Sequence, residues 1–249
     1  MNNQKRIAII GATSSIAEHC ARQWSLEEGV LLILVGRNIS KLERVAADLK
    51  VRQPTVKIEL VEADFIKPEA IQEAVNNLFR GGPITTALIA HGTLADQADC
   101  QSSLQLCQST LEVNGVSPVL FAEAFAQHMS KLNAGHIAII GSVAGDRGRR
   151  SNYVYGAAKG LVTRYAQGLQ HRFAGSGVQV TLIKPGPTDT PMTASMDGNG
   201  KFASPEDVAN TIITGIKKKK LVIYAPGKWQ AIMMVVRHLP SFIFNKMNI

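Results

Sequence analysis

The sequence predicts an α/β protein with a doubly wound Rossmann fold, in which helices cover both faces of a mostly parallel seven-stranded sheet. Short apolar runs alternate with amphipathic stretches of helical period along most of the chain. The connections between them are short, and no repeat, low-complexity tract or linker sets off a second domain. A chain of 249 residues can bury the core of one such domain.

The first strand is predicted at residues 6–10, residues 11–17 follow it, and a helix is predicted to run on to about Trp24. Between them lies a turn of small residues that begins at Gly11. This layout is typical of a site for the phosphates of a dinucleotide, because the helix N-terminus and its backbone N–H groups favour an anion. An ordinary βα turn remains the alternative, since the turn has one glycine where such sites often have three.

The second strand is predicted at residues 31–35 and is followed by Arg37. Sites for NADH usually have an acid here that binds the ribose 2′-hydroxyl, whereas an arginine suits the 2′-phosphate of NADPH. No acid follows until Glu43, and Arg37 therefore predicts NADP(H) in preference to NAD(H). The alternative is an arginine that only covers the surface. Ser40 and Glu43 have capping-box spacing, which predicts that the next helix begins at Ser40.

The remaining elements alternate in the same way. Further strands are predicted at residues 56–61, 85–90, 136–141, 178–183 and 221–224. Helices are predicted at residues 68–79, 106–132, 155–173 and 204–218. Residues 93–103 are predicted to form a loop, and the polar stretch 192–203 is predicted to form a mobile lid over a substrate. Ser204, with proline after it, predicts a helix N-terminus.

Tyr155 and Lys159 are four residues apart in a predicted helix and therefore share one face. A free phenol has a pKa of about 10, and a nearby ammonium group lowers it, which suits tyrosine to general acid or base catalysis. Ser142 follows a predicted strand and could bind the same substrate oxygen. A carbonyl held between these two hydroxyls is arranged to receive a hydride. For the isolated pair, a solvated lysine on a surface helix is the alternative.

Taken in order, these residues resemble the short-chain dehydrogenase/reductase family over roughly residues 5–225. The resemblance implies a catalytic tetrad of Asn114, Ser142, Tyr155 and Lys159, with thirteen residues from the serine to the tyrosine. It implies that these residues bind the cofactor: Gly11, Thr13, Ser14, Ser15, Ile16, Arg37, Asp64, Phe65, Ala90, Gly92, Tyr155, Lys159, Pro185, Gly186, Thr188 and Thr190. Where the family has Asn-Asn-Ala-Gly, this chain has Ile-Ala-His-Gly at residues 89–92 and keeps only the last glycine. His91, within this stretch, is expected to line the cofactor site.

The resemblance implies hydride transfer between the nicotinamide and a substrate carbonyl carbon. In reduction, Tyr155 would donate the proton, Lys159 would lower its pKa and hold the ribose hydroxyls, and Ser142 would orient the carbonyl oxygen. Asn114 would support a water linked to Lys159, although a structural hydrogen bond in the core is the simpler interpretation of a lone asparagine. Members of the family commonly form dimers or tetramers, so a homodimer or homotetramer is predicted.

The net charge of +8 is concentrated at the C-terminal end, because seven Lys or Arg residues and no acid follow Asp207. Cys20, Cys100 and Cys107 show no metal-binding spacing, so no metal is predicted and the thiols are expected to be reduced. With no apolar signal region and no run long enough to span a bilayer, a cytoplasmic protein is predicted. Nucleic acid is not a predicted partner, because no nucleic-acid-binding motif is present.

Residues 1–225 are predicted to form the NADP(H)-binding domain, and residues 226–249 a basic, apolar C-terminal extension. The extension pairs lysine and arginine with aromatic and aliphatic residues around Pro240, which breaks its helix. Such a segment suits an anionic membrane surface, which would place the protein peripherally on the inner face of the cell membrane. The alternative is a tail that packs on the body or on a partner subunit.

The extension, with Tyr224-Ala-Pro-Gly-Lys-Trp229 and Arg237-His-Leu-Pro240, is also similar to a bacterial subgroup of the family. That subgroup includes the keto-reductase half of decaprenylphosphoryl-ribose 2′-epimerase. The similarity implies an NADPH-dependent reductase of a keto-sugar on a polyprenyl-phosphate carrier, with a separate oxidase as partner. Two alternatives stay open. One is a reductase of a small soluble or acyl carbonyl compound whose tail serves oligomerisation, and the other is a non-enzymatic NADP(H)-binding scaffold.

Overall fold

The computed structural model describes residues 4–194, 196 and 202–247. Its seven strands form one parallel sheet in the order β3-β2-β1-β4-β5-β6-β7. The strands are β1 (Lys5–Ile10), β2 (Val30–Gly36), β3 (Lys57–Glu62), β4 (Thr86–Ile89), β5 (Gly135–Ile140), β6 (Val178–Pro185) and β7 (Val222–Ala225). The predicted fold class is confirmed. Because the strand order reverses direction between β1 and β4, the connections that leave their carboxyl ends run to opposite faces of the sheet, and the crevice between them is where ligands bind in such sheets.

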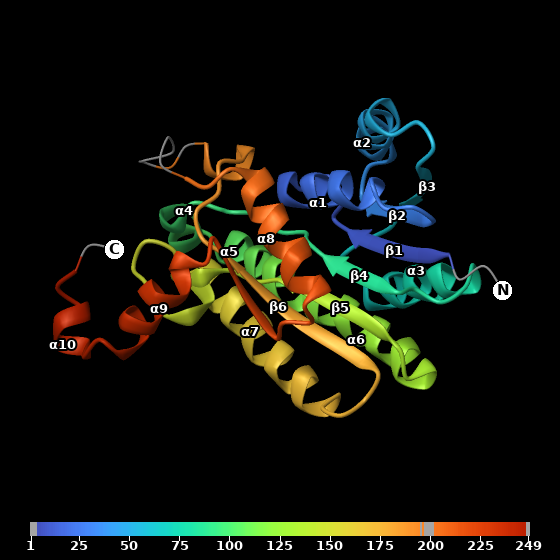
Figure 1. Ribbon diagram of the computed structural model, residues 1–249. Helices are drawn as coiled ribbons and strands as arrows, with labels where there is room; N and C mark the ends of the chain where they lie inside the picture. The colour runs from blue at the N-terminus through green and yellow to red at the C-terminus, as the bar shows by residue number, and fades with distance from the viewer. Residues whose placement is uncertain (1–3, 195, 197–201, 248–249) are drawn as a thin grey trace.

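Helices cover both faces of the sheet (Figure 1). The first face is covered by α1 (Ser15–Ser25), α2 (Ile39–Arg52) and α8 (Pro205–Lys217). The second is covered by α3 (Pro68–Arg80), α6 (Ser117–Leu132) and α7 (Tyr153–Arg172). Alternate residues of a strand point to opposite faces, so β1 places Ile7 and Ile9 in one core and Ala8 and Ile10 in the other. Burial on both faces explains why the strands are continuous apolar runs.

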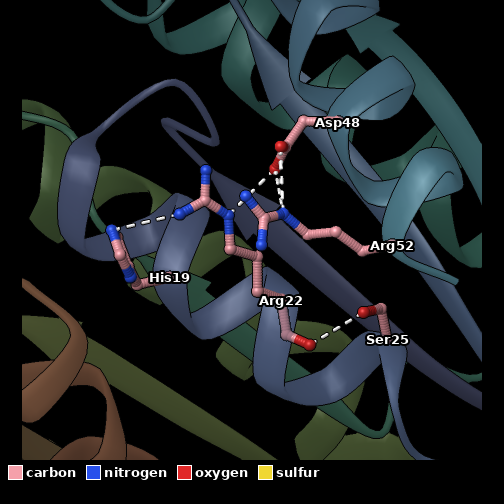
Figure 2. Close-up of polar contacts among 5 residues, drawn as sticks. All are labelled: His19, Arg22, Ser25, Asp48 and Arg52. Atoms are coloured by element: carbon pink, nitrogen blue, oxygen red, sulfur yellow. Dashed lines mark hydrogen bonds and ion pairs between the residues drawn. The ribbon is translucent and has the colours of Figure 1, made fainter.

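Ion pairs at the surface join α1 to α2 (Figure 2). The Asp48 carboxylate accepts hydrogen bonds from Arg22 Nε at 2.9 Å and from Arg52 Nε at 3.0 Å. The Arg22 guanidinium also lies 3.2 Å from His19 Nε2, and the Ser25 hydroxyl donates to the Arg22 carbonyl at 2.7 Å. All three charged side chains are at least a quarter exposed, so each pair contributes roughly 0–1 kcal/mol.

Two predicted helix starts had different outcomes. Helix α2 does not begin with a capping box at Ser40 and Glu43, and that prediction is wrong. Asn38 is the N-cap, and its Oδ1 accepts a hydrogen bond of 2.9 Å from a backbone N–H of the first turn. Asparagine in an extended conformation is as good an N-cap as serine. Here Asn38 precedes Ser40 in the chain, and its side chain accepts the hydrogen bond from the backbone N–H of Lys41. Ser204 caps α8 as predicted, at 3.0 Å.

The segment after β4 is not the loop that was predicted for residues 93–103, because it contains the helix α4 (Gln97–Ser102). Asp96 caps this helix by accepting hydrogen bonds from two backbone N–H groups, at 2.7 and 3.3 Å. Within this helix, Cys100 is buried. A six-residue helix that is held by its cap has too few apolar positions to show a helical period in the sequence.

The long helix predicted at residues 106–132 is divided. It consists of α5 (Leu104–Leu111), the π-helical turn η1 (Glu112–Val116) and α6. The π turn carries Asn114 near its middle. Because a π turn inserts one residue without ending the helix, the apolar pattern of the sequence runs through it undisturbed. Such turns occur frequently at functional sites, and this one adjoins the cavity described below.

The C-terminal extension forms α9 (Lys228–His238) and α10 (Ser241–Phe244), which project from the end of β7 away from the sheet (Figure 1). Arg147 Nη1 donates to the carbonyls of Val236 and Leu239, each at 2.6 Å, and its guanidinium lies 3.7 Å from the centroid of the Phe244 ring. Met233 is buried. One side of the extension therefore packs on the body. The other leaves large apolar side chains exposed: Ile232, Met234, Val235, Phe242, Ile243 and Met247.

Within the described part of the chain, no helix combines the length and apolar character that a membrane crossing requires.

Candidate active site

A cavity of about 460 Å³ lies at the carboxyl ends of the strands, and its walls come from segments far apart in the sequence. Most of the predicted site residues line it: Gly11, Thr13, Ser14, Ser15, Ile16, Arg37, Phe65, Ala90, Gly92, Ser142, Tyr155, Lys159, Pro185, Gly186, Thr188 and Thr190. Asp64 and Asn114 are predicted site residues outside this lining. The fold thus brings both the predicted cofactor residues and most of the predicted catalytic residues to one place.

The turn after β1 has the form of an anion site. Gly11 has φ +80°, and a Cβ at this position would lie 2.7 Å from the backbone nitrogen of His91. The Ser14 N-cap makes no side-chain hydrogen bond to α1, so the N–H groups of the first helical turn have no capping partner. Ser14, Ser15 and Ile16 line the cavity at this helix N-terminus. The turn fits the phosphates of a dinucleotide, because the unpaired N–H groups and the helix dipole both favour negative charge.

Arg37 and Asp64 differ in their relation to the cavity. Arg37 follows the end of β2, is exposed and lines the cavity. Asp64 is exposed and turned to its own backbone, where its Oδ1 accepts from the N–H groups of Ile66 and Lys67 at 2.6 and 3.2 Å. These backbone hydrogen bonds lower the pKa of the Asp64 carboxyl. The next residue, Phe65, is the one that enters the lining.

Ser142, Tyr155 and Lys159 meet at the end of β5. Ser142 follows that strand, and Tyr155 lies in the first turn of α7. Ser142 makes a side-chain hydrogen bond to Tyr155. Lys159 is buried one turn further along α7, where its Nζ donates to the Ile140 carbonyl at 3.2 Å and lies 5.7 Å from the centroid of the Tyr155 ring. The three functional groups therefore surround one point at the base of the cavity.

Burial shifts the pKa values of Tyr155 and Lys159. It raises the pKa of Tyr155, and the hydrogen bond with Ser142 opposes part of that rise. The direction is the reverse of the lowering by Lys159 that the sequence led us to expect. The physical reason is that burial disfavours the phenolate, while the ammonium group is directed to a main-chain carbonyl. Burial also lowers the pKa of Lys159 to about 8.

Asn114 is fully buried, and its amide makes three hydrogen bonds within the protein, the longest of which runs from Nδ2 to Thr93 Oγ1 at 3.4 Å. Its Nδ2 donates to the Thr110 carbonyl and its Oδ1 accepts from the Thr93 N–H, both at 2.9 Å. The same Oδ1 lies 2.8 Å, and Lys159 Nζ 3.6 Å, from the point that a Cβ on Gly92 would occupy. Asn114 therefore has a structural role, and it also faces the space that Gly92 leaves open beside Lys159.

His91 is a buried, neutral side chain that lines the cavity. Its Nε2 lies 2.8 Å from Ser117 Oγ, and its ring packs edge-on against Phe65 and Phe121. Burial lowers the pKa of His91 to about 3, with smaller contributions from Lys159 and Arg37. An imidazole that is neutral and packed in this way forms part of the cavity wall, and its place beside the cofactor stays a prediction.

The family model of the short-chain dehydrogenases matches residues 5–199. This chain belongs to the short-chain dehydrogenase family. It is therefore an oxidoreductase, and the fold and family support a nicotinamide cofactor for it.

Known short-chain dehydrogenases and related oxidoreductases resemble this chain over nearly its whole length. An oxidoreductase of Mycobacterium tuberculosis is 30% identical over 242 residues, which cover 97% of this chain and 96% of the relative. One of Streptomyces coelicolor is 27% identical and covers 98% and 96%. Among solved structures, a short-chain dehydrogenase from Sphingobium yanoikuyae in complex with NADPH has a TM-score of 0.81 at 23% identity and covers 98% and 96% of the two chains. These likenesses agree with the sheet order and the helical layers described above.

Part of the cavity of this short-chain dehydrogenase was not predicted from the sequence. Its additional lining residues include Glu18, Leu94, Val113, Arg149 and Asn152, whereas Met192, Thr193 and Met196, which also line it, belong to the predicted lid. Arg149 and Asn152 stand between the predicted catalytic residues Ser142 and Tyr155. Their polar character at this place in the sequence was the signal that could have identified them. The predicted lid at residues 192–203 is only partly described, and residues 195 and 197–201 lie outside the described residues. Among the residues that the structure describes, no group of three or more His, Cys, Asp or Glu side chains could hold a metal.

Proposed function

We propose that this short-chain dehydrogenase is an NADPH-dependent ketone reductase. The observation that carries the proposal is the meeting of Ser142, Tyr155 and Lys159 in the cavity that begins at the Gly11 turn. A ketone oxygen between two hydroxyls, beside a dinucleotide site, is the arrangement that hydride transfer needs. When bound, NADPH supplies the hydride that adds to the carbonyl carbon, and the products are a secondary alcohol and NADP⁺.

Tyr155 is the proton donor in this proposal. Its raised pKa keeps the phenol protonated at neutral pH, so its hydroxyl can transfer a proton to the carbonyl oxygen as the hydride arrives. Ser142 donates a hydrogen bond that orients the same oxygen. Lys159, whose pKa is lowered to about 8, stays a cation at neutral pH and stabilises the phenolate that remains. The space between Asn114 and Lys159 suits a water that returns a proton to this pair.

The preference for NADPH rests on Arg37. Its guanidinium is exposed at the end of β2 and lines the cavity at the place where the ribose of a dinucleotide is expected. Glu18 is the one carboxylate among the described residues of the lining, and it lies on α1. An arginine at this place suits the 2′-phosphate of NADPH. Fluorescence titration should give a lower Kd for NADPH than for NADH, and Arg37→Ala should remove the difference. A preference of the unaltered protein for NADH would refute this assignment.

A matched pair of tyrosine variants tests the chemistry. Tyr155→Phe removes the proposed proton donor, whereas Tyr153→Phe removes a hydroxyl from a half-exposed side chain two residues earlier on α7. Tyr155→Phe should lower kcat for ketone reduction by about 10²–10⁴-fold and change the NADPH affinity far less, because the other residues expected to bind the cofactor are kept. Tyr153→Phe should have kcat within twofold of the unaltered protein. Full turnover by Tyr155→Phe would show that the mechanism is wrong, and NADPH binding with no turnover of any ketone would favour a scaffold.

We further propose a keto-sugar on a polyprenyl-phosphate carrier as the substrate. Support comes from the C-terminal extension, which lies beside the cavity. A Cβ on Gly186, a residue of the cavity lining, would lie 1.9 Å from Trp229 Nε1, so the indole covers this edge of the site. The outer side of α9 and α10 exposes apolar side chains, such as Val235 at 63% and Phe242 at 71%. Basic residues accompany them, and this combination suits an anionic membrane surface on which a lipid carrier resides.

Vesicle co-sedimentation tests the extension. The double variant Val235→Asp/Phe242→Asp places charge on two exposed positions of the extension, and Val51→Asp is a matched change at a position that is 83% exposed on α2. The unaltered protein and Val51→Asp should sediment with phosphatidylglycerol vesicles at low salt, and the double variant should stay in the supernatant. If no protein sediments and the double variant alters the oligomeric state, the extension is a subunit contact. A small soluble or acyl carbonyl substrate would then be favoured.

The same proposal has consequences for partners. A reductase that acts on a keto-sugar needs a separate oxidase that forms the ketone from a hydroxyl group. Both enzymes would act on the cytoplasmic side of the membrane, where NADPH is available. We also propose a homodimer or homotetramer, whose mass is measured by light scattering.

A further inference from the structure

Two polar side chains between Ser142 and Tyr155 have no part in the chemistry proposed above. Arg149 and Asn152 both line the cavity. Arg149 Nε and Asn152 Oδ1 are buried atoms without a hydrogen-bond partner within the described protein. A buried polar group without a partner destabilises the folded protein, so native structures seldom keep one that no ligand completes. One of these atoms is a donor and the other an acceptor.

The position of these side chains assigns them to the substrate half of the cavity. They lie on the loop that follows β5 and the short helix η2 (Val143–Asp146) and leads into α7. The expected dinucleotide sites, the Gly11 turn and Arg37, follow β1 and β2. Because β4 lies between β1 and β5 in the sheet, Arg149 is separated from both of these anion sites. The ketone, by contrast, is expected between Ser142 and Tyr155, at the two ends of the loop.

We propose that Arg149 and Asn152 form a subsite for a phosphate ester carried by the ketone substrate. The guanidinium would bind oxygens of the ester, and Asn152 Oδ1 would accept a hydrogen bond from a neighbouring hydroxyl of the same molecule. The inference rests on the proposed ketone reductase function and adds a chemical requirement to its substrate. A guanidinium is planar and presents paired N–H donors that match the geometry of phosphate oxygens.

The charges of the cavity support an anionic ligand. The ion pairs among the described residues do not include Arg149. Burial lowers the pKa of Arg149, which reflects a charge that has lost water and gained no counterion. A buried cation of this kind is stabilised when an anion pairs with it. Glu18, the carboxylate of the described lining, lies on α1 beside the Gly11 turn and not on the loop of Arg149.

The unpaired acceptor Asn152 Oδ1 restricts the kind of ligand that fits the subsite. A carboxylate alone would satisfy Arg149 but would leave Asn152 Oδ1 unpaired. A phosphorylated polyol provides both an anion and a hydroxyl donor within a few bonds of each other. A keto-sugar joined to phosphate at the carbon next to its ketone fits this requirement, because it places the anion close to the reacting carbonyl.

Calorimetry on the full-length protein loaded with NADP⁺ tests the subsite without turnover, because the oxidised cofactor cannot reduce a ketone. The probes are dihydroxyacetone phosphate and dihydroxyacetone, which differ by the phosphate ester. The variants are Arg149→Gln and Arg164→Gln, which remove the same charge, the second from an exposed position on α7. The unaltered protein should bind the phosphate ester at least tenfold more tightly than the neutral ketone. Arg149→Gln should remove that preference and leave the affinity for the neutral ketone unchanged, and Arg164→Gln should behave as the unaltered protein.

Several results would overturn the subsite. It is wrong if the unaltered protein shows no preference for the phosphate ester, or if Arg149→Gln keeps the preference. It is also wrong if Arg149→Gln weakens both probes and NADPH equally, because that pattern indicates a general structural role. Farnesyl phosphate and methyl phosphate, added as competitors, separate a lipid-linked ester from a free one. A phosphate preference without ketone turnover would retain the subsite and refute the reductase, so the two proposals fail separately.

Discussion

Arg147 fastens the C-terminal extension to the loop next to the active site, and Arg147→Gln should release it. One guanidinium nitrogen donates to the last carbonyls of α9, from Val236 and Leu239, at 2.6 Å each. Those carbonyls have no partner within the helix, because the last turn of any α-helix leaves its C=O groups free. The guanidinium also lies over the Phe244 ring at 3.7 Å. Glutamine is too short to make these three contacts together.

The magnitude follows from these contacts. A hydrogen bond from a charged group contributes about 1.5–3 kcal/mol, and a cation–π contact about 0.5–1 kcal/mol at an exposed site. The contributions do not add fully, because both hydrogen bonds come from one nitrogen and water can reach the freed carbonyls. A net loss of about 2–3 kcal/mol corresponds to a roughly 30–150-fold larger opening equilibrium of the extension.

Native-state hydrogen exchange measures this opening. Amides of α9 should exchange roughly 30–150-fold faster in Arg147→Gln, while the amides of β5 should keep their wild-type rates. Arg164→Gln is the control, since it removes the same charge from an exposed residue. Unchanged exchange in α9 would show that Arg147 does not hold the extension. An equal acceleration in β5 would show that the residue acts on global stability instead.

Three further predictions concern the interior. Gly11→Ala should weaken NADPH binding at least about tenfold in a fluorescence titration, because φ is +80° and a Cβ would lie 2.7 Å from a backbone nitrogen; an unchanged Kd would contradict the geometry of the turn. Asp146→Asn should lower the free energy of unfolding in urea by about 3–5 kcal/mol, because it leaves Lys184, whose side chain is 3% exposed, as an uncompensated buried charge. The surface variant Asp48→Asn should lower it by less than about 1 kcal/mol. Equal effects of the two variants would refute this contrast between buried and exposed ion pairs. The pKa of Lys159 is lowered from 10.5 to about 8 in the folded protein, so the unfolded state binds more protons between these values and wild-type stability should rise with pH in that window. Lys159→Met should therefore be more stable than the wild type at pH 7, and this advantage in the free energy of unfolding in urea should shrink by pH 10. A difference in stability that does not change with pH would show that Lys159 titrates normally.

The helical period made the pairing of Tyr155 with Lys159 predictable, since residues four apart share a face in any helix. The alternation of apolar strands with amphipathic helices likewise predicted a parallel sheet and placed the site at its carboxyl edge. These inferences succeeded because they depend on local geometry that does not change with context. Arg37 and Gly11 were found in the same way, since each directly follows a strand end.

Other features depended on competition between hydrogen bonds or on burial, which periodicity and spacing do not show. Asn38 caps α2 in place of Ser40, and a π turn replaces an α-helical turn at Asn114. Each outcome depends on which of several nearby groups accepts a backbone hydrogen bond. The raised pKa of Tyr155 follows from burial, which the spacing to Lys159 could not show.

By itself, the sequence determined the fold class, the family and the residues of the proposed chemistry, because periodicity and spacing encode local backbone geometry. Tertiary structure alone decided that Arg147 holds the extension and that Arg149 enters the cavity. Burial and long-range contacts set the charge state and the partners of a side chain, and neither can be computed from the residues beside it in the chain.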